Sequence, residues 1–173
     1  MKPNTLPDVN SLLEQMAAQL AGTLLARGLN DVCMIGIHTG GAWIARELHQ
    51  RLAIGEALGT LDISFYRDDF SRAGMHPQVK PSNLPFDVED RAIILVDDVL
   101  QSGRTVRAAL NEIFDYGRPA SVLLAVLVER SGRELPIQAD VCGMRLELGP
   151  DEQIKLNGPE PLTLSLQTRN DHQ

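Results

Sequence analysis

The chain has 173 residues, 43% of them hydrophobic and 23% charged, which predicts one globular domain over residues 1–173 with a substantial core. Its net charge of −7 argues against a protein that coats nucleic acid non-specifically. Two cysteines exclude a disulfide framework and no apolar run is long enough for a membrane span, so we expect a cytoplasmic protein without membrane contacts.

The first predicted element is a helix, because apolar residues recur at helical spacing between Val9 and Leu24. Ser11 and Glu14 have the spacing of a capping box and are expected to begin this helix. Gly28 follows the last periodic residues and is expected to end it.

Two strands and a second helix follow. Val32–Ile37 is a continuous apolar run, typical of a strand buried on both faces, and residues 38–41 interrupt it. Apolar spacing over residues 44–52 predicts a helix, and alternation over residues 61–66 predicts a strand. Residues 67–90 contain three prolines and show no period, which indicates a long loop with a function.

The second half continues the alternation. Residues 92–96 form the most apolar run of the chain and predict a central strand. Helical spacing over residues 106–114 follows, and Gly117 ends it. Residues 122–128 predict another buried strand, and a short strand near residues 139–142 precedes a tail that we expect to be irregular.

Buried strands that alternate with helices predict an α/β fold, with a central, mostly parallel sheet flanked by helices. In such sheets ligands bind beyond the carboxyl ends of the strands. Two segments occupy that position, residues 38–41 and residues 97–105. The chain shows no internal repeat, low-complexity segment or linker, so one domain is expected.

Residues 97–105 carry the groups of a phosphate site between a strand and a helix. Gly103 allows the backbone to approach a ligand closely. Ser102 and Thr105 offer hydroxyl groups, and the free N–H groups at the start of the helix favour an anion. The segment therefore predicts a phosphate cradle that lacks the lysine of a P-loop.

Asp97 and Asp98 precede this cradle and suit a different part of the ligand. Carboxylates are poor partners for phosphate but good acceptors for two vicinal hydroxyl groups. An ordinary helix cap explains one carboxylate, but not two after a buried strand. A pair that binds a diol beside a phosphate cradle predicts a ribose 5-phosphate site.

Residues 93–105, IILVDDVLQSGRT, resemble the signature of the type I phosphoribosyltransferases. Further segments resemble the PyrR family: YRDD at 66–69, GRTVRA at 103–108, GRP at 117–119, VER at 128–130 and RELPI at 133–137. The resemblance covers most of the chain from about residue 32 to about residue 156. It implies the type I phosphoribosyltransferase fold with a small C-terminal hood, in a family that combines a pyrimidine-operon regulator with a uracil phosphoribosyltransferase.

The resemblance implies a reaction in which uracil and phosphoribosyl diphosphate give UMP and diphosphate, with Mg²⁺ as cofactor. The ion would be held mainly by ligand oxygens and waters, so no protein residue is assigned to the metal. The expected ligands are phosphoribosyl diphosphate, uracil and UMP or UTP. The family suggests a homodimer or homotetramer.

The resemblance also assigns binding roles to residues. Thr39 and Gly40 would lie in the diphosphate-binding loop. Arg130 and the backbone near Ile154 would contact the nucleotide and uracil. The full set expected to bind substrate is Thr39, Gly40, Asp97, Asp98, Val99, Leu100, Gln101, Ser102, Gly103, Arg104, Thr105, Arg130 and Ile154.

A loop that closes over the substrate is expected to begin at Arg67. The transition state would be oxocarbenium-like at the ribose C1, and water must be kept from it. Arg67, with Arg72 or Lys80, would stabilise the departing diphosphate. The residues expected to be catalytic are Arg67, Asp97 and Asp98, although Arg67 can also be a solvated loop charge.

Some of these side chains have purely structural interpretations as well. Arg130 and Arg133 can simply pair with Glu129 or Glu134.

Two conspicuous residues have no assigned chemistry. His38 suits the end of a strand, and Trp43 suits helix packing or an interface.

RNA binding is doubtful on the sequence. Family members that bind messenger RNA usually carry Thr-Arg-Gly in the diphosphate loop, where this chain has Thr-Gly-Gly at 39–41. Residues 12–25 contain no Lys, Arg or His, although RNA-binding members place basic and polar residues there. Nine of the 16 Lys and Arg residues lie in residues 66–133, which suits a multiply anionic small molecule. Neutral drift is the alternative explanation for Gly40.

Functions of different classes therefore compete. One is an enzyme that makes UMP, and the other is a nucleotide-sensing regulator with little or no catalysis. Residues 67–90 discriminate between them, because only catalysis needs a closing lid. A third hypothesis is a phosphoribosyltransferase for another base such as hypoxanthine or guanine, and the resemblance after Val128 speaks against it.

Overall fold

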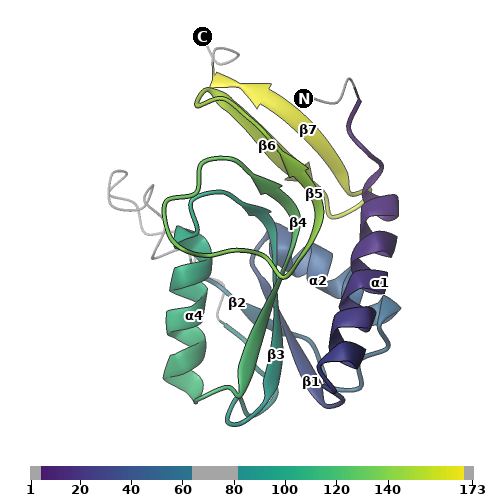
Figure 1. Cartoon of the computed structure of the whole chain (residues 1–173), viewed down its shortest axis with the longest axis vertical. Helices are drawn as coiled ribbons and strands as arrows, with labels where there is room; N and C mark the ends of the chain where they lie inside the picture. The colour runs from purple at the N-terminus through teal and green to yellow at the C-terminus, as the bar shows by residue number, and fades with distance from the viewer. Residues whose placement is uncertain (1–4, 64–81, 170–173) are drawn as a thin grey trace.

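The computed structural model describes residues 5–63 and 82–169 (Figure 1). The residues expected in the lid, Arg67, Arg72 and Lys80, lie outside the described residues, as does the end of the strand expected at residues 61–66. The described part contains three helices, a five-stranded sheet and a two-stranded sheet. None of these helices is both long and apolar enough to cross a bilayer.

The first helix, α1 (Val9–Ala26), has a different cap from the one expected. Asp8 is the N-cap, and its carboxylate accepts a hydrogen bond from the N–H of Ser11 at 3.3 Å. The capping box expected from Ser11 and Glu14 is therefore wrong, because a carboxylate upstream takes the place of the Ser11 hydroxyl. Gly28, with a φ of +65°, follows the helix as expected.

The central sheet consists of five parallel strands in the order β2-β1-β3-β4-β5. All residues of β1 are buried, as its continuous apolar run predicts, and the central strand β3 and its neighbour β4 contain long buried runs. The strands are β1 (Val32–Ile37), β2 (Gly59–Leu61), β3 (Ala92–Leu100), β4 (Ser121–Arg130) and β5 (Val141–Leu146).

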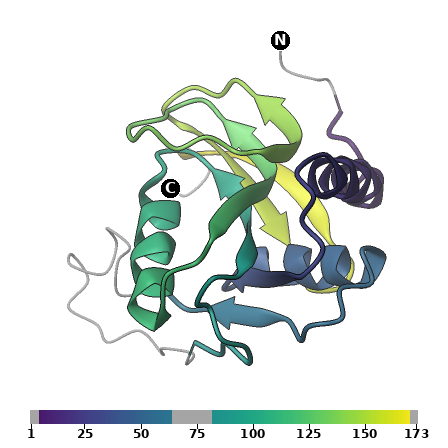
Figure 2. The ribbon, with the colours of Figure 1, turned by 60° about the horizontal axis from the view of Figure 1, so that its bottom comes forward.

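Helices cover both faces of this sheet. Helices α1 and α2 (Gly40–Arg51) pack on one face, and α4 (Arg104–Tyr116) packs on the other (Figure 1, Figure 2). Because β1 leads into α2 and its neighbour β3 leads into α4, the chain changes faces between these two strands. Such a switch point opens a crevice beyond the carboxyl ends of the two strands, where open α/β sheets bind ligands.

The ends of the strands differ from those expected. β3 continues past residue 96 to Leu100, and β4 continues past residue 128 to Arg130. The two strands keep each other in register there, since Leu100 pairs with Glu129, so backbone pairing continues beyond the apolar run. β2 ends at Leu61, where a strand was expected to begin, because its residues 59–61 are the ones that pair with β1.

The C-terminal tail is a hairpin, and the expectation of an irregular tail is wrong. β6 (Glu152–Asn157) pairs antiparallel with β7 (Thr163–Thr168), and the hairpin lies beyond the carboxyl ends of β4 and β5 (Figure 1). Ile154 and Leu156 alternate with exposed residues and are buried in the core beneath. The hairpin confirms the small C-terminal hood that the resemblance implies.

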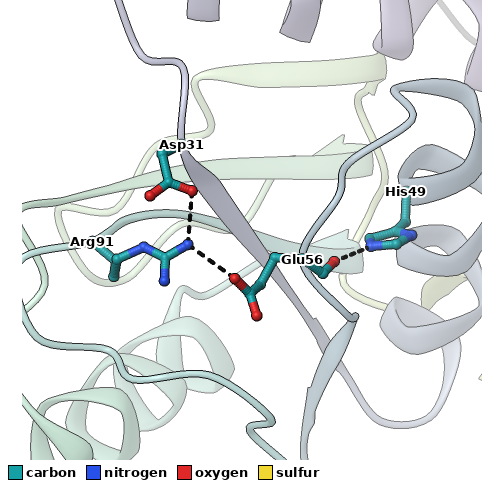
Figure 3. A network of polar contacts seen from close by, with 4 residues as sticks. All are labelled: Asp31, His49, Glu56 and Arg91. Carbon is teal, nitrogen blue, oxygen red and sulfur yellow. Dashed lines mark hydrogen bonds and ion pairs between the residues drawn. The ribbon is translucent and has the colours of Figure 1, made fainter.

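Arg91 connects the amino ends of β1, β2 and β3 (Figure 3). This end of the sheet lies opposite the carboxyl ends, where the switch point is. Its Nη2 lies 3.0 Å from a carboxylate oxygen of Asp31, before β1, and 3.3 Å from one of Glu56, before β2. The Nε2 of His49 in α2 lies 2.7 Å from the carbonyl oxygen of Glu56. Among the described residues, the buried Nε of Arg91 has no hydrogen-bond partner.

We expect Arg91→Ala to lower the free energy of unfolding by about 1–2 kcal/mol, because it removes two ion pairs and the packing of a long apolar stem. Arg91→Met keeps the stem and removes the buried unpaired Nε, so its loss should be less than half as large. Urea unfolding followed by circular dichroism measures both variants. Equal losses would show that the ion pairs, and not the stem, stabilise this edge.

Candidate active site

Three glycines, Gly36, Gly40 and Gly41, let the first turn of α2 lie directly against β1 and the end of β3. We call them the glycine seam. A Cβ atom on Gly36 would lie 2.8 Å from the Cα of Ala42, and one on Gly41 would lie 2.7 Å from the carbonyl oxygen of Val96. Both distances are shorter than Cβ atoms tolerate, and backbone atoms cannot move aside cheaply. The close approach of helix and strand therefore requires glycine at these positions.

The two carboxylates of β3 meet this first turn of α2. Asp97 is 3% exposed, and its Oδ1 accepts a hydrogen bond from the N–H of Asp98 at 2.8 Å. The Oδ1 of Asp98 accepts one from the N–H of Val99 at 2.9 Å. The Asp98 carboxylate occupies the place that a Cβ atom on Gly40 would take. The amino end of α2 carries partial positive charge, which favours negative charge at this position.

The turn after β3 is shorter than the sequence predicts. A loop was expected over residues 97–105, but the strand continues to Leu100 and α4 begins at Arg104, which leaves residues 101–103 as the turn. The reason is that β4 runs beside β3 to its end. Gly103 has a φ of +93°, a conformation that favours glycine, and it turns the chain into the helix.

The amino end of α4 presents free backbone donors. The Oγ of Ser102 accepts a hydrogen bond from the N–H of Arg104 at 3.1 Å. The Ser102 carbonyl accepts from the two N–H groups of residues 134–135, each at 3.0 Å, so the turn is fixed. Within the described part of the chain, the N–H groups of Thr105 and Val106 have no acceptor. Free N–H groups at the positive end of a helix suit an anion such as phosphate.

The glutamates near this site have other partners than expected. Glu134 pairs with Arg104 at 3.0 Å, and Glu129 pairs with Arg145 at 3.1 Å. The sequence suggested Arg130 and Arg133 as their partners, and this expectation is wrong for both glutamates. The cations come instead from the start of α4 and from the neighbouring strand β5.

Arg130 joins the end of β4 to the hood. It is 7% exposed, and its guanidinium donates to the carbonyl oxygens of Glu152 at 2.6 Å, Ser131 at 3.0 Å and Gly149 at 3.4 Å. Burial lowers the pKa of Arg130 from its ordinary value. Since three backbone carbonyls accept from its guanidinium, one of them in β6, Arg130 holds the strand that contains Ile154 beyond the strand ends.

Trp43 packs α2 against the turn of the hood. A Cβ atom on Gly158 would lie 3.0 Å from the Trp43 ring, so the ring contacts the segment that joins β6 to β7. The N–H of Trp43 donates to the carbonyl of Thr39 at 3.3 Å, within the first turn of α2. The expectation of helix packing is confirmed. His38 follows β1 as expected, and its N–H donates to the carbonyl of Leu61 at 2.8 Å.

A cavity of about 260 Å³ opens beside the turn that precedes α4. It lies at the carboxyl ends of β3, β4 and β5, and its walls include Leu100, Gln101, Glu129, Arg130 and Arg145. Gln101 lines the cavity and is also the first residue of the turn, so the cavity lies next to the amino end of α4. The sequence did not reveal the cavity, because β5 was expected near residues 139–142 and Arg145 was assigned to an irregular tail.

A metal ion would depend on the ligand at this site. In residues 5–63 and 82–169, no group of three or more His, Cys, Asp or Glu side chains is arranged to hold an ion. Mg²⁺ commonly binds through one or two carboxylates together with ligand phosphates and waters. Asp97 and Asp98 therefore fit a Mg²⁺ ion that enters with a phosphorylated ligand.

Comparison with known proteins agrees with this geometry. A family model for the phosphoribosyl transferase domain matches residues 6–161. The chain is 60% identical to the bifunctional protein PyrR of Nitrosococcus oceani, over 92% of each chain. It is 58% identical to the bifunctional protein PyrR of Pseudomonas savastanoi pv. phaseolicola, over 94% of this chain and 96% of the relative. This chain belongs to the PyrR family.

Solved structures show that the PyrR-family fold seen here is that of type I phosphoribosyltransferases. A hypoxanthine phosphoribosyltransferase from Staphylococcus aureus has a TM-score of 0.64 at 17% identity, over 83% of this chain and 77% of that chain. One from Trypanosoma cruzi has a TM-score of 0.63 at 20% identity, over 81% and 74%. Phosphoribosyltransferases bind phosphoribosyl diphosphate and a nucleobase or nucleotide, and they generally use Mg²⁺ with the diphosphate substrate.

We expect Trp43→Ala to lower the free energy of unfolding by about 2–3 kcal/mol, because a half-buried ring that packs the hood against α2 is lost. Trp43→Phe keeps an aromatic ring at this place and should cost about 1 kcal/mol or less. Hydrogen exchange of the β6 amides should accelerate in Trp43→Ala and stay near wild type in Trp43→Phe. Unchanged β6 exchange in Trp43→Ala would contradict the role of Trp43 in holding the hood.

Proposed function

We propose that this chain transfers the 5-phosphoribosyl group from phosphoribosyl diphosphate to uracil, which gives UMP and diphosphate. One observation carries the proposal: two adjacent carboxylates, Asp97 and Asp98, lie at the switch point of the sheet, between the amino ends of α2 and α4. The names of the relatives, bifunctional proteins PyrR, support it. We further propose that residues 1–173 act as one cytoplasmic domain that forms a homodimer or homotetramer.

The 5-phosphate of the ribose is assigned to residues 101–105. Two N–H groups at the start of α4, those of Thr105 and Val106, have no acceptor among the described residues and can donate to phosphate oxygens. The Oγ of Ser102 accepts a hydrogen bond from the N–H of Arg104, which leaves the hydroxyl proton of Ser102 for the phosphate. The Thr105 hydroxyl adds a further donor. The Arg104 side chain pairs with Glu134, so we place it at the rim of the phosphate site.

The ribose is assigned to Asp97 and Asp98. Each carboxylate uses its Oδ1 to accept a backbone N–H, which fixes its orientation. The Oδ2 of Asp98 lies beside Gly40 at the crevice and is placed to accept from a ribose hydroxyl. Val99 and Leu100, the last residues of β3, would form the floor under the sugar.

The diphosphate is assigned to Thr39 and Gly40 at the amino end of α2. Thr39 is exposed and forms no side-chain cap, so its hydroxyl can donate to a diphosphate oxygen. When bound, Mg²⁺ would neutralise part of the diphosphate charge. Arg67, with Arg72 or Lys80, stays the proposed cation for the leaving diphosphate and lies outside the described residues.

Uracil is assigned to the cavity beside Gln101, at the carboxyl ends of β3, β4 and β5. The backbone near Ile154 in β6 would contact the base. Because the Arg130 guanidinium donates to three backbone carbonyls, we propose that Arg130 acts on the base mainly by holding the hood in place. A hood that covers the ribose C1 would exclude water from an oxocarbenium-like transition state.

The word bifunctional in the names of the relatives supports a second role, in which UMP or UTP at the same site controls pyrimidine genes. We propose that RNA contributes little to that role. The outward side of α1 carries only uncharged residues between positions 15 and 25. Gly40 carries no cation that could pair with an RNA phosphate, and a larger side chain at this position would meet the Asp98 carboxylate.

Steady-state assays with phosphoribosyl diphosphate and each nucleobase test the proposal directly. We expect UMP synthesis from uracil, and a large loss of kcat/KM in Asp98→Asn, because a neutral amide accepts less strongly from a hydroxyl. Thr105→Val should weaken UMP binding in calorimetry by about 1.5–3 kcal/mol, the range for a hydrogen bond to a charged group.

The matched control is Thr23→Val, which removes a hydroxyl that bonds within α1, at 2.9 Å from the carbonyl of Gln19. Its UMP affinity should equal that of the wild type. UMP binding without any turnover would favour the sensing regulator over the enzyme. Turnover with hypoxanthine but not uracil would replace the proposed base.

A further inference from the structure

Three neighbouring strands end in register at the proposed base cavity. Leu100 at the end of β3 pairs with Glu129 in β4, and Glu129 pairs with Arg145 in β5. All three residues line the cavity of about 260 Å³. Glu129 is therefore one strand away from β3, which carries Asp97 and Asp98, and Arg145 is two strands away.

Glu129 and Arg145 form an ion pair with unused hydrogen-bonding groups. The Nε of Arg145 lies 3.1 Å from the Oε2 of Glu129. The Glu129 side chain is 17% exposed, so its carboxylate is held in the wall, while the Arg145 side chain is 69% exposed. Among the described residues, this single contact uses one oxygen of the carboxylate and one of the guanidinium nitrogens.

The other cation at the end of β4 is not available in the same way. Arg130 directs its donors to the carbonyl oxygens of Ser131, Gly149 and Glu152. A ligand that enters the cavity would therefore meet one acceptor in the Glu129 carboxylate and one set of donors in the Arg145 guanidinium. An acceptor next to a donor matches a ligand edge that presents an N–H next to a carbonyl.

Nucleobases differ at this edge. Uracil and hypoxanthine present a ring N–H beside a carbonyl oxygen, which is a lactam edge. Cytosine and adenine present a ring nitrogen acceptor beside an amino group, which is the reverse pattern. A partly buried carboxylate that faces a ring nitrogen lone pair would repel it, and the unpaired groups would cost free energy.

The order of the two residues fixes which atom each one meets. In a uracil nucleotide, N1 joins the ribose, O4 is the atom farthest from N1, and the N3–H lies between them. With the ribose at β3, as proposed, the nearer residue Glu129 would face the N3–H and the farther residue Arg145 would face O4. The same order would put the cytosine N3 lone pair against Glu129 and its amino group against Arg145.

We propose that Glu129 and Arg145 are specificity-determining residues that select a base with a lactam edge. The Glu129 carboxylate accepts a hydrogen bond from the base N–H, and the Arg145 guanidinium donates to the adjacent carbonyl oxygen. The inference rests on the proposed phosphoribosyl transfer only for the position of the ribose. A merely structural ion pair at this exposed end of the sheet would affect stability slightly and base preference not at all.

Two variants test the pair, Glu129→Gln and Arg145→Met. We expect each to raise the KM for uracil about 10- to 100-fold, as for the loss of a hydrogen bond to a charged group, while the KM for phosphoribosyl diphosphate changes less than about twofold. The matched control is Arg27→Gln, which breaks the ion pair of Arg27 and Asp140, at 3.4 Å, away from the cavity. Its two KM values should stay at the wild-type level.

Calorimetry with UMP and CMP separates this inference from the proposed function. The wild type should prefer UMP, and Glu129→Gln should reduce the ratio of the two affinities about tenfold or more. Wild-type protein that makes no UMP would refute the proposed enzyme, yet the ratio would still decide the inference. An unchanged ratio in both variants, with circular dichroism showing that they fold, would overturn the assignment of Glu129 and Arg145.

Discussion

The close approach of α2 to the end of β3 is the constraint on which the rest of the site depends. The glycine seam of Gly36, Gly40 and Gly41 removes the side chains that would hold the helix away. The amino end of α2 consequently lies against Asp97 and Asp98, and the amino end of α4 follows three residues after β3. Two positive helix ends flank two carboxylates within one crevice, an arrangement that we propose binds phosphates and a ribose diol together.

Sequence patterns predicted the buried parts of the fold better than the ends of its elements. β1 has the expected bounds because a continuous apolar run corresponds to continuous burial. β3 was expected to stop before Asp97 because the polar residues interrupt the run, but pairing with β4 extends the strand to Leu100. The residues after 142 were expected to form an irregular tail, but they form the last part of β5 and the two short strands of the hood, which lie on either side of Pro159 and Pro161.

The candidate site divides in the same way. The groups proposed to bind the phosphate and the diol lie in one continuous segment, residues 97–105, so local residue types alone suggested them, and their roles stay predictions. Two of the three partners of Arg130, and the partner of Glu129, lie 16 to 22 residues away along the chain and become neighbours only through β5 and the hood. No local pattern could distinguish their real partners from nearby charges, and the cavity between them depends on the register of three strands.

The glycine seam leaves the Asp98 carboxylate in the position from which we propose that it binds a ribose diol. Titration of UMP into Gly40→Ala by calorimetry tests it most directly, because the added Cβ atom would occupy the place of that carboxylate. We expect an affinity at least about tenfold weaker than that of the wild type, with an unchanged circular dichroism spectrum. Wild-type affinity for UMP in the folded Gly40→Ala variant would contradict it.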